Sequence, residues 1–139
     1  MGFRRLPATL LVLVSCICNA GTPPSALLNK LSVLAGPNSL DCGSVPLRSD
    51  RTRAVACAQA ASNASKAYRV AFQLEGTDSA IWQGAAQDSA GKIWIAFSDS
   101  DLSDESGKNA TLSVLPCRAI HFVTQGGEVL DCEPISNAR

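Results

Sequence analysis

Apolar and polar residues alternate along the stretch 68–99, and this pattern constrains the fold more than any other feature of the chain. From Tyr68 to Leu74 every second side chain is apolar, which is the period of a half-buried β-strand. Turn-forming residues occur at 76–78 and again at 88–91. The stretch therefore predicts three consecutive antiparallel strands.

The two turns also predict how these strands pair. A three-residue loop at 76–78 sets Phe72 opposite Trp82. A four-residue turn at 88–91 sets Trp82 opposite Phe97. Both registers place the three aromatic side chains on one face, and a slip of one residue in either hairpin would turn a whole strand over.

Two helices are expected on this sheet. The first follows Ser25 as N-cap and carries leucines at helical spacing as far as Ala35, where a Gly-Pro pair ends it. The second is expected from Ser49 or Asp50 to about Lys66. Its inward face would carry small residues at helical spacing, namely Ala54, Cys57, Ala58 and Ala61. Such a helix can approach a sheet closely, so we expect the core between it and the aromatic face.

The C-terminal part predicts a hairpin. Strand-like residues run from Leu112 to Thr124, and Pro116 interrupts them, which favours an edge, a bulge or a break. A turn at 125–128 leads to a short strand at Val129–Cys132, and residues 134–139 are expected to be loose. The predicted fold class is α+β, with one or two helices packed on a mostly antiparallel meander sheet of four or five strands, in one domain at 25–133.

The N-terminal segment is typical of an export leader. Two arginines precede an apolar run at Leu6–Val14 that is too short to span a membrane as a helix. Cleavage after Ala20 is one expectation. The other is lipoprotein processing, which a full lipobox match favours. In that case Cys16 is lipidated and becomes the mature N-terminus, and its lipid anchors the protein to a membrane. Either route predicts that the protein is exported. The destination is the periplasm or the outer membrane if the source is bacterial, and otherwise the protein is secreted. Residues 21–24 are expected to be a tether.

Four cysteines remain after cleavage at Ala20, and they predict two disulfides. They are Cys42, Cys57, Cys117 and Cys132, and each consecutive pair is fifteen residues apart. Three connectivities can join them; we favour 42–57 and 117–132, because the first ties a loop to the second helix and the second closes the C-terminal hairpin. No CxxC occurs and no cysteine adjoins a histidine, so thiol chemistry and zinc are not expected.

No constellation of residues predicts catalysis or a cofactor. His121 is the only histidine and has no obvious nucleophile to activate. Residues 76–79 lack the G-x-S-x-G of a nucleophile elbow and lie in a hairpin. Without Arg4 and Arg5 the chain keeps ten of its twelve basic residues against twelve acidic ones, which gives no case for nucleic acid. We expect no enzyme, no cofactor and no small-molecule substrate.

Carboxylates are expected to gather at one end of the meander. The predicted rim comprises Glu75, Asp78, Asp99 and Asp101, with Asp104 and Glu105 in the loop beyond. An EF-hand is excluded, because Asp104 stands where that loop requires glycine and Ala110 where it requires glutamate. We expect a solvated acidic rim without metal, open to a basic protein partner.

The face of the sheet opposite the aromatic core is expected to carry Trp94 and Ile81 beside Arg69 and Gln83. A solvated face would not need Trp94 or Ile81. Either the N-terminal helix covers them, or the four residues form a patch that binds a protein partner.

Four short motifs lie between residues 42 and 101: C-G-x-V at Cys42, A-x-x-C-A at Ala54, G-x-D-S at Gly76 and D-S-D at Asp99. Over this range the chain resembles uncharacterised small bacterial secreted and lipoprotein families, a resemblance that implies no activity. The function expected is that of an exported, non-catalytic protein-binding module, for example an inhibitor or immunity protein of a secreted enzyme. The alternative is a structural envelope lipoprotein without a discrete ligand, with a small hydrolase or Ca²⁺-binding protein a distant third.

Overall fold

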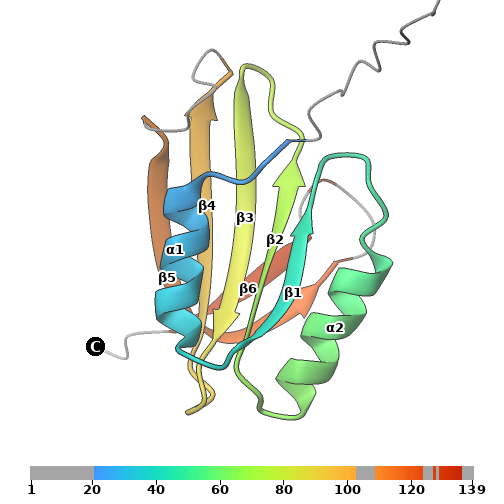
Figure 1. Ribbon diagram of the computed structural model, residues 1–139, viewed down its shortest axis with the longest axis vertical. Coiled ribbons are helices and arrows are strands. Elements are labelled where there is room, and N and C mark those ends of the chain that lie inside the picture. Colours follow the sequence, from blue (N-terminus) through green and yellow to red (C-terminus); the bar gives the residue numbers. More distant parts are fainter. Residues whose placement is uncertain (1–20, 103–108, 124–126, 128, 136–139) are drawn as a thin grey trace, which may run out of the picture.

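A computed structural model describes residues 21–102, 109–123, 127 and 129–135, which form two helices and a six-stranded sheet (Figure 1). The elements are α1 (Ser25–Ala35), β1 (Leu40–Val45), α2 (Thr52–Asn63), β2 (Tyr68–Leu74), β3 (Ser79–Gln87), β4 (Ile93–Asp101), β5 (Thr111–Phe122) and β6 (Leu130–Pro134). The strands lie in sequence order, and every pair except β1–β2 is antiparallel. The predicted α+β class is confirmed.

β1 is the strand that the sequence pattern did not predict. It pairs parallel with β2, and α2 is the crossover between them. Its register shifts between Asp41 and Ser44, where Gly43 takes φ of 93° and donates its N–H to Asp41 Oδ1 at 2.9 Å. A short strand that is polar and bulged lacks the alternation that identifies strands in sequence.

Helix α1 covers one face of the sheet. The predicted N-cap at Ser25 is wrong by one residue: Pro24 precedes the helix, and its carbonyl accepts the N–H of Leu27 at 3.0 Å. Leu27 and Leu31 are buried against Trp82 and the alanines around it.

Helix α2 packs on the other face, against β1 and β2, and is shorter than expected. The Asp50 carboxylate accepts the N–H of Thr52 at 2.9 Å, and this bond lowers the pKa of Asp50. At the other end Ser65 adopts φ of 52°, which stops the helix before Lys66. The alanine face packs on the sheet as predicted, with Ala54, Val55, Ala58 and Ala61 buried.

The predicted register of both β3 hairpins is wrong by one residue. Gln83, rather than Trp82, lies opposite both Phe72 and Phe97. Because both hairpins are shifted by one residue, the side chains of β2 and β4 still point to the faces predicted for them. Those of β3 point to the opposite faces. Trp82 therefore packs under α1, while Gln83 points toward the side of α2.

Turn chemistry explains one of these slips. Asp88 donates its N–H to the Lys92 carbonyl at 3.0 Å, so the loop has three residues rather than four. The Asp88 side chain accepts the N–H groups of Ala90 and Lys92, and Gly91 takes φ of 81°. This is the three-residue hairpin loop that ends on a left-handed glycine.

Strand β5 changes partner along its length. Residues 111–117 pair with β4 and residues 117–122 pair with β6, with a register shift after Cys117. The strand bends there, and β6 passes behind the sheet on the side opposite α1 (Figure 1). The predicted hairpin is confirmed by the pairing of β5 with β6, and Pro116 marks the change of partner. Its predicted turn lies outside the described residues except for Gly127.

Within the described part of the chain, neither helix is long and apolar enough to cross a membrane. The leader and Cys16 lie outside the described residues, so their processing stays a prediction.

Candidate functional site

The four residues predicted to form a partner-binding patch do not share one face. Arg69 and Trp94 lie on the α1 side, in one cross-strand row with Ala86 between them. Ile81 and Gln83 lie on the α2 side, because β3 is turned over. Gln83 is fully buried, so the expectation of a shared patch is wrong.

Arg69 and Trp94 occupy positions flanking α1. Arg69 pairs with Asp41 at 2.9 Å and donates to Ser39 Oγ at 3.0 Å, and these bonds hold the start of β1 against β2. Trp94 is half-buried and lies opposite Pro116 of β5. The alternative prediction, that the N-terminal helix covers Trp94 and Ile81, is wrong for Ile81, which packs on the α2 side. Helix α1 instead covers Trp82 and the alanines around it.

The predicted rim residues that the structure describes lie at one end of the sheet, beside a cation, Arg48. Glu75 and Asp78 lie in the β2–β3 connection, and Asp99 and Asp101 lie at the end of β4. Glu75 pairs with Arg48 at 3.9 Å, and both side chains are exposed. Asp104 and Glu105 lie outside the described residues. In the described ranges no group of three or more His, Cys, Asp or Glu side chains is placed to hold a metal ion.

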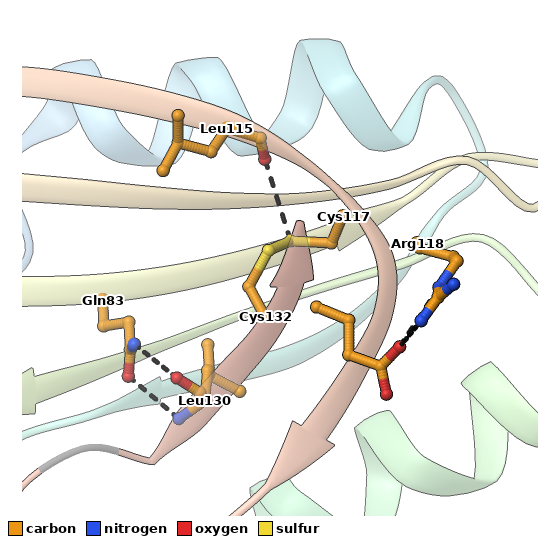
Figure 2. Close-up of a disulfide and its surroundings, with 7 residues drawn as sticks. Gln83, Leu115, Cys117, Arg118, Leu130 and Cys132 are labelled. Atoms are coloured by element: carbon orange, nitrogen blue, oxygen red, sulfur yellow. Dashed lines mark hydrogen bonds and ion pairs between the residues drawn. A yellow bond between two sulfur atoms is a disulfide. The ribbon is translucent and has the colours of Figure 1, made fainter. Parts of the chain in front are cut away.

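Both predicted disulfides are confirmed. Cys42–Cys57 joins β1 to α2, and Cys117–Cys132 joins β5 to β6. Figure 2 shows the second bridge at the bend of β5. Two disulfides are typical of proteins that fold in an oxidising, exported environment.

A buried glutamine holds β6 in place. Gln83 Nε2 donates to the Leu130 carbonyl at 2.7 Å, and Gln83 Oε1 accepts the Leu130 N–H at 2.9 Å (Figure 2). The same oxygen accepts the Val129 N–H at 3.2 Å. The side chain thus takes the place of a neighbouring strand along the inner edge of β6, and it satisfies backbone groups that would otherwise be buried without partners.

An apolar groove of about 430 Å³ lies where β6 passes over β4 and β5. The apolar residues of its lining are Ile95, Phe97, Leu115, Pro116, Leu130, Pro134 and Ile135. Leu115 is 55% exposed and Ile135 is 52% exposed, although both are large and apolar. Among the described residues that line it, Asp131 is the only one with a charged side chain.

The β5 edge beside this groove, residues 111–116, has no described strand on the side away from β4, because β6 first pairs at Cys117. Pro116 has no N–H, so it cannot form a hydrogen-bonded pair with Trp94, which lies opposite. In an antiparallel ladder the hydrogen-bonded pairs alternate, so Leu112 and Val114 are also unbonded to β4. Their N–H and C=O groups point toward the open side. None of the residues 111–116 is charged.

A charged cluster lies on the exposed surface of the β5–β6 hairpin. Glu133 accepts hydrogen bonds from His121 at 2.8 Å and from Arg118 Nη2 at 2.6 Å, and these bonds lower the pKa of Glu133. Among the described residues no hydroxyl or thiol hydrogen-bonds to His121. The arrangement is a surface ion-pair network rather than a nucleophile with its base.

Sequence reasoning missed the groove and the free edge. The signal for the edge was Pro116, but a proline alone does not say which strand lacks a neighbour. The groove depends on the bend of β5 and on Gln83, and no local pattern encodes either. Comparison of the chain with models of known protein families, with curated proteins and with solved structures gave no match.

Proposed function

We propose that this chain is an exported, non-catalytic protein-binding module that binds its partner at the groove between β4, β5 and β6. The observation that carries this proposal is the pair of large apolar side chains, Leu115 and Ile135, left more than half exposed beside a concave apolar surface. Scattered exposed leucines need no explanation, but a contiguous apolar hollow is a feature of interaction sites.

The composition of the groove fits a protein partner better than a small polar ligand. Its walls come mainly from apolar residues of three strands, and Asp131 supplies the one charge in the described part of the lining. Protein interfaces combine an apolar centre with few charges and a polar rim. An inhibitor or immunity protein of a secreted enzyme is one class of module that works in this way.

Capture from the exported protein fraction of the source organism tests the proposal. The protein is immobilised as wild type and as Leu115→Asp, which places a charge in the groove. The matched control is Val33→Asp, because Val33 is an apolar residue of α1 that is 75% exposed and lies away from the groove. We expect a stoichiometric partner that the Leu115→Asp variant loses and the control retains.

Two results would count against the groove. A partner that both variants retain would place the binding surface elsewhere, and Trp94→Asp then tests the α1 side. The absence of any stoichiometric partner would favour the structural role.

A further inference from the structure

We propose that two copies of this chain pair through the free edge of β5, antiparallel about a two-fold axis at Ser113, to form one continuous sheet. This goes beyond the proposed function, because the occupant of the edge is a second copy rather than a foreign partner. The inference rests on the backbone groups of the edge, on the side chains that flank it and on the protection of the other edges.

The outward backbone groups of β5 are complementary to themselves. A two-fold axis at Ser113 sets Leu112 opposite Val114 of the second copy, and Val114 opposite its Leu112. Both residues point their N–H and C=O groups to the open side, so each of the two pairs is a hydrogen-bonded pair. The dimer would gain four backbone hydrogen bonds without rearrangement of either ladder to β4.

The side chains are also compatible with their own copies. The same register sets Thr111 opposite Leu115, and Leu112 opposite Val114, so no charge meets a like charge. Leu112 and Val114 pack against the core cluster under α1. Pairing would extend this cluster across the axis, and on the other side of the sheet it would place Thr111 of the second copy beside Leu115.

The other edges of the sheet carry protection that β5 lacks. β1 has a bulge at Gly43 and a charge at Asp41, two devices that discourage strand addition. The inner edge of β6 is occupied by the side chain of Gln83. An uncharged edge that has no bulge and no described strand over it favours pairing with another strand, and closed two-fold pairing is the commonest form of self-association.

The length of the dimer contact is set by β6. The second copy can pair with residues 111–115, because Pro134 of β6 already lies opposite Cys117. Interfaces of this size are below the standard class, so we expect a weak, concentration-dependent dimer rather than an obligate one.

Sedimentation equilibrium of the oxidised protein over about three decades of concentration tests the pairing. Val114→Pro removes an outward N–H but no bond to β4, a position at which strands accept proline. Its control is Val114→Ala, which loses the same packing and keeps the N–H. We expect a dimer for wild type and Val114→Ala, and a monomer for Val114→Pro at every concentration.

Disulfide trapping tests the register. Ser113 and its copy would form a non-hydrogen-bonded pair with Cα atoms about 4.5 Å apart, which a disulfide can span. Ser113→Cys should therefore form a covalent dimer under mild oxidation. Thr111→Cys is the control, because Thr111 is also exposed but lies about 13 Å along the strands from its own copy.

The outcomes separate this inference from the proposed function. A monomer at all concentrations, or equal trapping at positions 111 and 113, would overturn the dimer even if Leu115→Asp abolishes capture of a foreign partner. Selective trapping at 113 with loss of the dimer in Val114→Pro would establish it even if no foreign partner is captured.

Discussion

Gln83 and Leu130 lie 47 residues apart in the sequence, and the side chain of the first binds both backbone groups of the second. Gln83 stands on the central strand β3 and is fully buried. Its amide ties the returning strand β6 to the middle of the sheet, and β6 in turn forms one wall of the groove. The candidate site therefore depends on a single buried polar side chain.

Replacement of Gln83 by leucine should be strongly destabilising. It would leave the Leu130 N–H and C=O and the Val129 N–H without partners, and each such buried group costs about 1–3 kcal/mol. We expect Gln83→Leu to lower the free energy of unfolding by about 3 kcal/mol or more, as measured by urea denaturation.

Gln87→Leu is the control for this prediction. Gln87 is also buried on β3, but its bonds to Ser62 and Lys66 are longer, at 3.3 Å each. It should cost about 1 kcal/mol. Equal losses in the two variants would contradict the special role of Gln83.

The sequence predicted the positions of β2, β3 and β4 well, but it predicted wrongly which side chains of β3 point to each face of the sheet. Alternation identified β2 and β4, because each carries mainly small or polar residues on one side and mainly large apolar residues on the other. β3 carries Trp82, Gly84 and Ala86 on one face and Gln83 and Ala85 on the other, so neither face is decisively apolar. Only the turn lengths were left to set the register, and the hydrogen bond between Asp88 and Lys92 shortened one loop by a residue.

The candidate site was less predictable than the fold. The disulfide pairing followed from spacing and hairpin position, and the structure confirms it. The groove is lined by β4, β5 and β6, and the position of β6 depends on the bond from Gln83 of β3 to Leu130, which lies 47 residues away in the sequence. A local pattern can predict that Pro116 ends a pairing, but it cannot predict which strand passes over the gap.

Gly84 should not tolerate a side chain while Leu31 is present. A Cβ at this position would lie 2.6 Å from Leu31 Cδ1, because α1 packs directly on the glycine. We expect Gly84→Ala to lower stability by about 1–3 kcal/mol, as overpacked cores do. Leu31→Ala should cost about 2–5 kcal/mol by itself.

The double variant separates the two effects. Added to Leu31→Ala, the Gly84→Ala change should be neutral or stabilising, because the new methyl group enters the cavity that the leucine leaves. A double-mutant cycle in thermal denaturation measures this coupling. Additive losses would show that α1 does not rest on Gly84.

Tyr68 should be replaceable by phenylalanine at neutral pH. Its hydroxyl is buried without a hydrogen-bond partner among the described residues; Ser62 contacts it but donates to Gln87. Burial raises the pKa of Tyr68 from 10.0 to about 12, and the Ser62 hydroxyl partly opposes that rise. We expect Tyr68→Phe to change the free energy of unfolding by less than about 1 kcal/mol at pH 7.

The raised pKa of Tyr68 predicts how the free energy of unfolding changes at alkaline pH. A pKa raised on folding gives stability that is full below the unfolded value of 10.0 and is lost as the pH rises to about 12. Wild type should therefore lose stability between these values, and Tyr68→Phe should lose less. If the free energy of unfolding falls equally with pH in wild type and Tyr68→Phe, Tyr68 is not the group that causes the alkaline loss.

Glu133 should contribute to the loss of stability at acidic pH. Hydrogen bonds from His121 and Arg118 lower its pKa below the ordinary value of 4.5, so its contribution is present above that value and is lost as the pH falls through the lowered one. We expect Glu133→Gln to be less stable than wild type near pH 6, and we expect the difference to disappear as the medium becomes more acidic. Urea denaturation at a series of pH values measures it.

Salt and a neighbouring carboxylate provide the controls for Glu133. The side chains of Arg118 and Glu133 are 74% and 38% exposed, so added salt should screen the interaction and reduce the difference near pH 6. Asp131→Asn changes a second exposed carboxylate of β6 that accepts no hydrogen bond from Arg118 or His121. This variant should leave the acid limb as in wild type. A loss equal to that of Glu133→Gln would mean that the net charge of the hairpin, rather than the bonds to Glu133, sets the acid stability.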